Sequence, residues 1–411
     1  MIFLFSTLQF SLFSLALVIA GYIFLGKKLS KGEVDSSTIP EPLGALPLFG
    51  HLHLLRGKEL ICKKLASISE KHGPIFSLKL GSYRLVVASD PKTVKECFTT
   101  NDLALATRPN IAFGRYVGYN NASLTLAPYG DYWRDLRKIV TVHLFSNQSI
   151  EMLGHIRSSE LNTFIKHLYK GSGGTSIVKI DMLFEFLTFN IILRKMVGKR
   201  IGFGEVNSEE WRYKESLKHC EYLAVIPMIG DVIPWLGWLD FAKISQMKRL
   251  FKELDSVNTK WLQEHLKKRS RNEKDQERTI MDLLLDILPE DIVISGHVRD
   301  VIVKATILES AKHVKIVSWE DTVLRKAHAY SSTFGNFIGI PRSGLTPKPL
   351  SLRGLRVVHF VLARLLQGFE LRKVSDEPVD MAEGPGLALP KINPVEVVVM
   401  PRLEPELYSS L

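Results

Sequence analysis

Residues 129–139 read Tyr129-Gly130-Asp131-Tyr132-Trp133-Arg134-Asp135-Leu136-Arg137-Lys138-Ile139, and they carry the clearest structural signal in the chain. Pro128 and Gly130 mark a break before this stretch, and Asp131 is predicted to be the N-cap of a helix. Apolar side chains then recur at helical spacing, at Trp133, Leu136, Ile139, Val140 and Leu144. The stretch therefore predicts an amphipathic helix.

Trp133 and Arg137 stand four residues apart, so the two side chains share one face of the predicted helix. An indole N–H and a guanidinium group are both hydrogen-bond donors, and arginine keeps its charge in proteins. The pair suits a buried carboxylate or phosphate. Taken alone, the pattern favours a plain amphipathic helix with a solvated basic edge, because Arg134 and Lys138 repeat the same spacing.

The residues just before the helix favour a binding role for Trp133 and Arg137 over a plain amphipathic helix. Trp-x-x-x-Arg preceded by Ala127-Pro128-Tyr129-Gly130 resembles the C-helix signature of plant microsomal cytochrome P450 monooxygenases. In that family the tryptophan and the arginine bind a propionate group of haem. The resemblance implies haem as the cofactor and Trp133 and Arg137 as its propionate ligands.

Composition and charge limit the remaining options. The 411 residues are 45% hydrophobic, which is enough for one large domain or two ordinary ones. A net charge of +11 predicts an anionic membrane surface or an acidic protein as a partner. Nucleic acid is disfavoured, because the basic residues are scattered and no aromatic-interleaved basic stripe occurs. The three cysteines, Cys62, Cys97 and Cys220, form no CxxC pair, which fits a reducing compartment.

The N-terminus predicts a membrane anchor. Ile2 to Leu25 is a run without a charged residue, long enough as a helix to cross a bilayer. Lys27, Lys28 and Lys31 follow the run, so the positive-inside rule places the rest of the chain on the cytosolic side. We expect a transmembrane signal anchor at 1–26 and a basic, proline-rich hinge at 27–50. This order resembles microsomal family members, which implies a single-pass protein of the endoplasmic reticulum membrane.

Residues 51–306 are expected to form the N-terminal and central helical part of a cytochrome P450-like domain. Ile75–Gly81 and Arg84–Ala88 predict two strands around a Gly81-Ser82 turn, and a helix follows Asp90-Pro91. Long helices are predicted over 208–223 and 241–269, and the family's I helix from Ile294. By resemblance, Phe113, Leu124 and, near the C-terminus, Leu387 line the substrate pocket. Ordinary core packing is the favoured alternative for Phe113 and Leu124 taken singly.

The resemblance stops after Thr306. The oxygen-activating groove of the I helix, the K-helix Glu-x-x-Arg and the Phe-x-x-Gly-x-Arg-x-Cys-x-Gly loop have no counterpart in 307–354. That loop supplies the thiolate ligand of the haem iron, on which O–O cleavage depends. Cys62, Cys97 and Cys220 match no family ligand position, so no metal ligand and no catalytic residue is identified. His313 or His328 could bind haem in principle but would not reproduce the thiolate.

From Leu355 the resemblance returns, with an expected L helix over 355–370 and closing strands beyond it, so 355–411 forms the last segment. The predicted fold is mainly α with small β-sheets (α+β), an incomplete cytochrome P450-like fold with an N-terminal transmembrane helix.

Two functions remain open. The first is a membrane-bound haem monooxygenase that oxidises a small apolar metabolite with O2 and electrons from an NADPH-dependent reductase. Its catalysis is expected to be impaired, because the cysteine loop is missing from the sequence. The second is a catalytically dead, membrane-anchored remnant or partner protein, or the product of a truncated gene model or splice form.

Overall fold

The computed structural model describes residues 39–57, 59–144, 154–172, 176–205, 207–272, 277–312, 360–374 and 392–410. Its helices are η1 (Leu52–Leu55), α2 (Ile61–His72), α3 (Pro91–Thr99), α4 (Asp102–Leu105), α5 (Ala112–Tyr116), α6 (Asp131–Ile139), η2 (Val140–Leu144), α8 (Gly154–Ser172), α9 (Ile180–Val197), α10 (Glu209–Ala224), α11 (Ile229–Val232), η3 (Pro234–Asp240), α12 (Phe241–Ser270), α13 (Ile280–Ile287), α14 (Arg299–Lys312) and α18 (Pro405–Ser410). An unlabelled helix covers residues 360–368. The strands are β1 (Ile75–Leu80), β2 (Tyr83–Ala88), β3 (Ser176–Lys179), β4 (Val293–Ile294), β5 (His297–Val298), β6 (Phe369–Lys373) and β7 (Glu396–Pro401). The predicted fold class is confirmed in its coarse form, mainly helical with small sheets.

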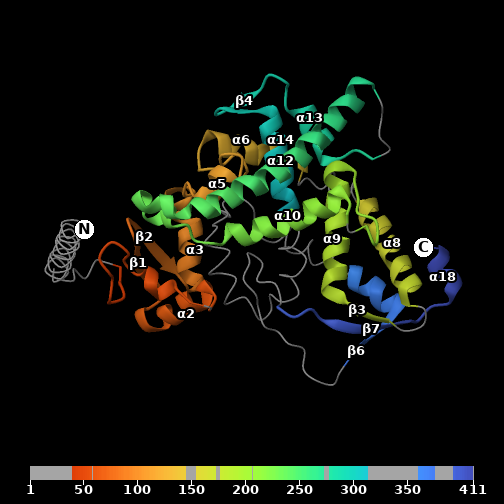
Figure 1. Cartoon of the computed structure of the whole chain (residues 1–411), viewed down its shortest axis with the longest axis horizontal. Coiled ribbons are helices and arrows are strands. Elements are labelled where there is room, and N and C mark those ends of the chain that lie inside the picture. Colours follow the sequence, from red (N-terminus) through yellow and green to blue (C-terminus); the bar gives the residue numbers. More distant parts are fainter. Residues whose placement is uncertain are drawn as a thin grey trace, which may run out of the picture.

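The described elements form three groups along the long axis (Figure 1). The hairpin β1–β2 with α2 and α3 lies at one end, and the helices α5, α6, α10, α12 and α14 lie in the middle. The sheet β3–β7–β6 with α8 and α18 lies at the other end. The central helices enclose the largest apolar core, which includes Trp133, Trp261 and Leu308.

The hairpin β1–β2 forms where the sequence predicts two strands and a turn. Its strands pair antiparallel from Ile75 with Ala88 to Leu80 with Tyr83, on either side of the Gly81-Ser82 turn. Gly81 has a φ of +56°, and a Cβ there would lie 2.5 Å from the Val232 carbonyl oxygen. Only glycine tolerates both conditions at once, so this residue allows the hairpin to pack against α11.

The second sheet joins distant parts of the chain. β7 lies between β3 and β6, so residues 396–401 pair with 176–179 on one side and with 369–373 on the other. Phe369 and Tyr408 are almost fully buried in a separate apolar cluster that this sheet forms with α8, α9 and α18. One of the closing strands that the sequence predicts beyond the L helix is therefore present as β7, and it ties the C-terminal segment to α8 and α9.

Three predicted boundaries are wrong. Gly130, not Asp131, is the N-cap of α6, and Asp131 instead contacts Arg134 one turn later. The helix α14 begins at Arg299 rather than Ile294, because residues 293–298 form the hairpin β4–β5 around Ser295 and Gly296. Both turn residues have positive φ, which ends any helical path there. Towards the C-terminus, Phe369 starts β6 instead of extending the preceding helix.

Several predictions fall outside the described residues. They are the anchor at 1–26, most of the joining stretch 307–354 including His313 and His328, and the substrate-lining candidate Leu387. Within the described ranges, no helix has the length and apolar character needed to cross a membrane. The helix α14 continues past residue 306 to Lys312.

Candidate functional site

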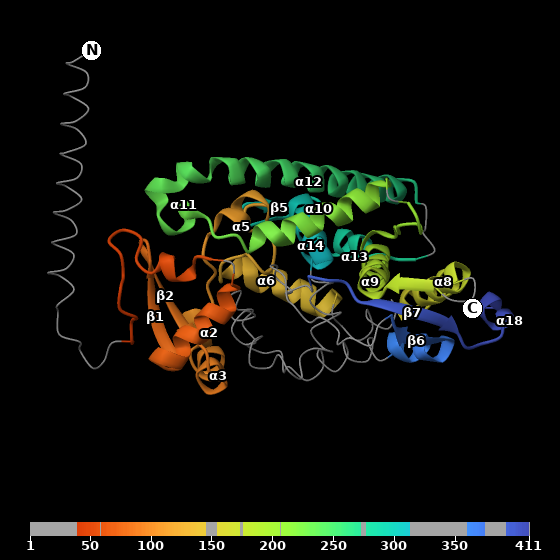
Figure 2. The ribbon, with the colours of Figure 1, turned by 60° about the horizontal axis from the view of Figure 1, so that its bottom comes forward.

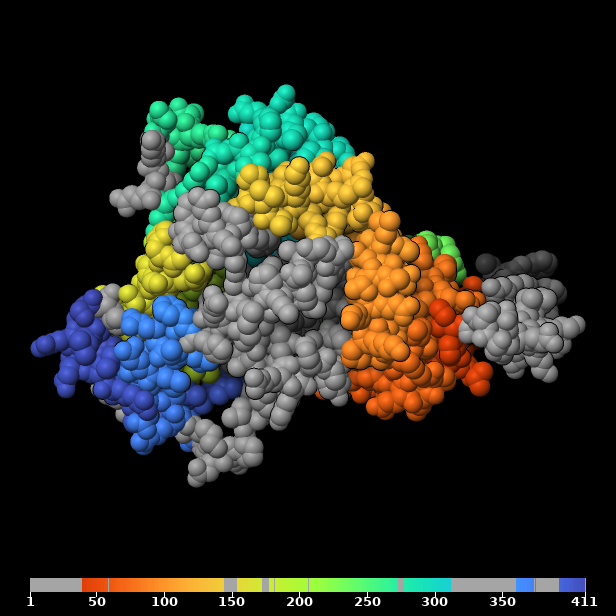
Figure 3. Space-filling view, turned by 180° about the vertical axis from the view of Figure 1, so that it is seen from behind, coloured from red at the N-terminus to blue at the C-terminus, as the bar shows by residue number. Residues whose placement is uncertain are grey.

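The predicted pair on α6 is present as a contact. Trp133 is 7% exposed within the central core, and the guanidinium carbon of half-buried Arg137 lies 4.8 Å from the centre of its ring. Figure 3 shows the residues around α6, in gold, between the orange N-terminal elements and the teal region of α13 and α14. The shared helix face is therefore confirmed, whereas its propionate-binding role remains a prediction.

The indole N–H of Trp133 donates to the carbonyl oxygen of Leu124 at 3.1 Å. This bond fixes the indole against the loop that precedes α6. Leu124 itself is only partly buried against the central core, and Phe113 on α5 is 6% exposed within it. Both candidates thus take part in core packing, the alternative that the sequence favoured, and their substrate-lining role stays a prediction.

Sequence reasoning did not select Glu309 and Arg108, although both lie at this site. Glu309 on α14 is 9% exposed, and its Oε1 accepts the backbone N–H of Thr125 at 2.9 Å. Burial lowers the pKa of Arg108 to about 10, and the nearby carboxylate of Glu309 acts in the opposite direction. Burial and the same carboxylate also raise the pKa of Tyr132. The available signal was a glutamate directly after the apolar residues Ile307 and Leu308.

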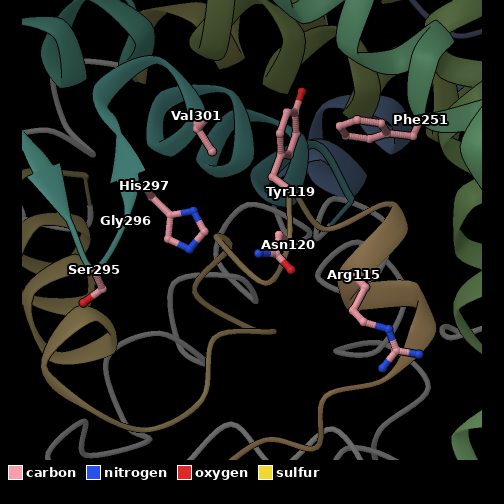
Figure 4. Close-up of a pocket in the computed structure, with 8 residues that line it drawn as sticks. All are labelled: Arg115, Tyr119, Asn120, Phe251, Ser295, Gly296, His297 and Val301. Atoms are coloured by element: carbon pink, nitrogen blue, oxygen red, sulfur yellow. The ribbon is translucent and has the colours of Figure 1, made fainter. Parts of the chain in front are cut away.

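A hollow of about 500 Å³ opens beside the turn that follows α5 (Figure 4). Its lining comes from α5 and the following turn, from α12, from the β4–β5 turn and from α14: Arg115, Tyr119, Asn120, Phe251, Ser295, Gly296, His297 and Val301. Neither Phe113 nor Leu124 belongs to this lining. His297 lies 5.0 Å from the Tyr132 ring, so the hollow borders α6.

The turn that edges this hollow is strained. Tyr119, Asn120 and Asn121 have φ values of 52°, 54° and 62°, the left-handed region that non-glycine residues adopt at a cost. The Tyr119 hydroxyl donates to Asp255 at 2.9 Å, and Lys304 on α14 contacts the same carboxylate at 2.7 Å. This network joins the turn to α12 and α14 and holds it in its left-handed conformation.

Haem fits this site only in part. The indole of Trp133 and the cations of Arg137 and Arg108 are donors of the kind that propionate groups need. No thiol lies among α5, α6 and α14, because the three cysteines belong to α2, α3 and α10. In the described part of the chain, no group of three or more His, Cys, Asp or Glu side chains is arranged to hold a metal ion. Trp133, Arg137 and Arg108 therefore form a cradle of donors for propionate carboxylates, but the described residues of the site provide no ligand for the iron.

Comparison with known proteins shows which family the chain is similar to. Residues 40–306 match the family model described as Cytochrome P450. Dimethylnonatriene synthase from Arabidopsis thaliana is 68% identical over 515 residues, covering 100% of both chains. Vinorine hydroxylase from Rauvolfia serpentina is 35% identical, covering 90% of this chain and 92% of the relative. A nicotine N-demethylase from Nicotiana tabacum is 28% identical, covering 95% and 98%.

The alignment with dimethylnonatriene synthase is longer than the 411 residues of this chain, so that relative contains residues that this chain lacks. The family match covers more than half of the chain, and its N-terminal limit falls in the proline-rich stretch before η1. Its range contains the Trp133 and Arg137 pair and the hairpin β1–β2. By these matches, the chain belongs to the cytochrome P450 family.

Proposed function

We propose that the chain derives from a membrane-bound, haem-dependent monooxygenase that uses O2 and electrons from an NADPH-dependent reductase, and that it is impaired in this reaction. Its substrate class is a small apolar specialised metabolite. The names of the relatives support this class, since one is named for a dimethylnonatriene, an apolar hydrocarbon, and others for hydroxylation of vinorine and demethylation of nicotine. The proposed location is the endoplasmic reticulum membrane, with a single N-terminal span and the body in the cytosol.

The proposed impairment is supported by the positions of the three cysteine thiols. Cys62 is 2% exposed on α2, Cys220 is 0% exposed on α10, and Cys97 lies on α3. Bound haem would supply iron-centred activation of O2, which in this family depends on a cysteine thiolate. The chain has no cysteine after Cys220, whereas the family loop precedes the L helix. The cradle at Trp133 thus has no thiolate partner.

A second candidate follows from the length of the alignment with dimethylnonatriene synthase. The 411-residue chain would then be a catalytically dead, membrane-anchored remnant or partner protein, or the product of a truncated gene model or splice form. Sequencing the transcript across the codons for residues 306–355 separates these cases. If the transcript encodes a longer in-frame product that contains the cysteine loop, that longer product is the active enzyme.

The reduced carbon-monoxide difference spectrum of the full chain in membranes, with haem content measured in parallel, tests the proposal. Dimethylnonatriene synthase from Arabidopsis thaliana, expressed in the same way, is the control. We expect the control to show the thiolate-type band and this chain to lack it, with or without bound haem. A thiolate-type band from this chain would overturn the impairment.

The role of the cradle has its own test. Arg137→Ala should lower haem occupancy, because the guanidinium that faces Trp133 is lost. Arg134→Ala is the matched control, since Arg134 lies on the same helix but is exposed and contacts Asp131. Equal haem occupancy in the two variants would remove Arg137 from the assignment.

A further inference from the structure

Glu309 is a buried acidic side chain in an apolar part of α14. Ile302, Val303, Ala305, Ile307 and Leu308 on the same helix are each no more than 2% exposed. A carboxylate among such neighbours requires hydrogen-bond donors, because burial of an uncompensated charge is costly. One donor is the backbone N–H of Thr125, 2.9 Å from Oε1. The side chain therefore joins α14 to the loop that precedes α6.

The same peptide group is held from its other side. The carbonyl oxygen of Leu124 and the N–H of Thr125 belong to one peptide bond, and the indole N–H of Trp133 donates to that carbonyl at 3.1 Å. A trans peptide is planar, with its N–H and C=O in opposite directions. Fixing the N–H towards Glu309 therefore directs the carbonyl towards Trp133.

Charge surrounds this peptide as well. Arg108 lies within the electrostatic range of Glu309. The guanidinium carbon of Arg137 lies 4.8 Å from the centre of the Trp133 ring. An external carboxylate that approached Trp133 and Arg108 would thus share Arg108 with the internal carboxylate of Glu309, which lies on the opposite side of the Leu124–Thr125 peptide from the indole.

We propose that Glu309 is a positioning residue that directs the Leu124 carbonyl towards the Trp133 indole and competes, as an internal carboxylate, with carboxylate ligands of this cradle. The inference rests on the proposed function, in which the cradle receives haem propionates. A propionate that takes the indole N–H leaves the Leu124 carbonyl without its donor. It also shares Arg108 with Glu309 and is repelled by its negative charge. Removing that charge favours the ligand.

The test uses the full chain and iron-free protoporphyrin IX, which carries the two propionates but needs no iron ligand. Glu309→Gln removes the charge and keeps an oxygen that accepts the Thr125 N–H. We expect it to bind the porphyrin roughly fivefold more tightly, the size of a partly screened charge interaction. Porphyrin fluorescence anisotropy measures this, and the porphyrin dimethyl ester should show no such gain.

Asp300→Asn is the matched control, because it removes a negative charge from the same helix about 13 Å away along its axis. Its porphyrin affinity should equal that of the parent chain. An unchanged or weaker affinity in Glu309→Gln, or an equal gain with the ester, overturns the competition. Absence of porphyrin binding in every variant overturns both the competition and the propionate role, whereas a missing carbon-monoxide band affects only the thiolate assignment.

Hydrogen exchange without porphyrin tests the positioning itself. Glu309→Ala removes the acceptor, so the backbone amide of Thr125 should exchange faster, while Glu309→Gln should keep its protection. Mass spectrometry of peptides over residues 120–128 resolves this, and peptides from α12 report general loosening. Equal exchange at Thr125 in the two variants contradicts the positioning role.

Discussion

Arg137 and Trp133 form one cation–π pair, with the guanidinium carbon 4.8 Å from the ring centre. The contact covers one face of the indole, while its N–H points along the ring plane to the Leu124 carbonyl. The two interactions are separate, because one uses the ring face and the other its edge. A substitution can therefore remove the hydrogen bond to Leu124 and keep an aromatic face for the contact with Arg137.

Trp133→Phe is expected to lower the free energy of unfolding by about 1–3 kcal/mol, because the partly buried Leu124 carbonyl loses its donor and a smaller ring leaves a gap. Urea denaturation measures the change. Trp238→Phe is the control, since Trp238 is 70% exposed and should change stability very little. A loss of equal size in both variants would show that the indole N–H contributes nothing specific.

The left-handed turn gives a second prediction. Tyr119→Phe removes the hydroxyl that donates to Asp255, so we expect a loss of about 1–2 kcal/mol in unfolding free energy. Released from this bond, residues 117–122 should also exchange their amides faster, because three consecutive left-handed residues then lack an anchor. The control is Tyr222→Phe, whose ring is 48% exposed on α10. Unchanged exchange in the turn would contradict the anchoring role of Tyr119.

The sequence predicted elements whose signals are local. The Asp90-Pro91 helix start, the Gly81-Ser82 turn and the long helix from Phe241 all appear where their residues indicate. The start of α14 was missed because His297 and Val298 fit a helical pattern as well as a short strand. Only pairing with Val293 and Ile294 decides between them, and such pairing depends on the tertiary fold.

The candidate site likewise contains residues that the sequence predicts and residues that only the folded chain brings together. Trp133 and Arg137 were predictable because four-residue spacing on one helix fixes a shared face. Glu309 and Arg108 lie about two hundred positions apart in the sequence, and no periodic pattern relates residues so distant. The contact between Glu309 and Thr125 depends on how α14 packs against the loop before α6, which is a property of the folded chain.

Lys195 on α9 gives a pH-dependent prediction. Burial, together with the positive charge of Arg157, lowers the pKa of Lys195 from 10.5 to about 8. The unfolded chain therefore binds more protons between pH 8 and 10.5, and stability rises with pH across this window. Below pH 8 the buried ammonium group destabilises the fold. Lys195→Met should then raise the free energy of unfolding at pH 7 by about 2 kcal/mol.

The difference between Lys195→Met and the parent chain should shrink as the pH rises towards 10. Urea denaturation at pH 7, 8.5 and 10 measures this trend. Lys252→Met on α12 is the control, since Lys252 is exposed and its ammonium group stays in water. A gain that is the same at all three pH values would point to better apolar packing by methionine rather than to the removed charge.

An exposed apolar edge gives the last prediction. Trp235, Trp238 and Phe241 are 58%, 70% and 77% exposed along η3 and the start of α12. The Val232 carbonyl accepts the Ser82 N–H, which places α11 beside the hairpin β1–β2, as Figure 2 shows. Phe49, 45% exposed, lies at the same turn, because its carbonyl accepts the Gly81 N–H. Aromatic side chains gathered in this way are typical of a membrane interface.

In vesicles that contain brominated lipid, the full chain should therefore lose part of its tryptophan fluorescence through contact quenching. Residues 1–38 contain no tryptophan, so the predicted anchor adds nothing to this signal. Trp238→Phe should lower the quenched fraction. Trp261→Phe should raise it, because Trp261 is 0% exposed and contributes only unquenched emission. An unchanged fraction in Trp238→Phe would mean that this edge stays in water while the chain is bound to the membrane.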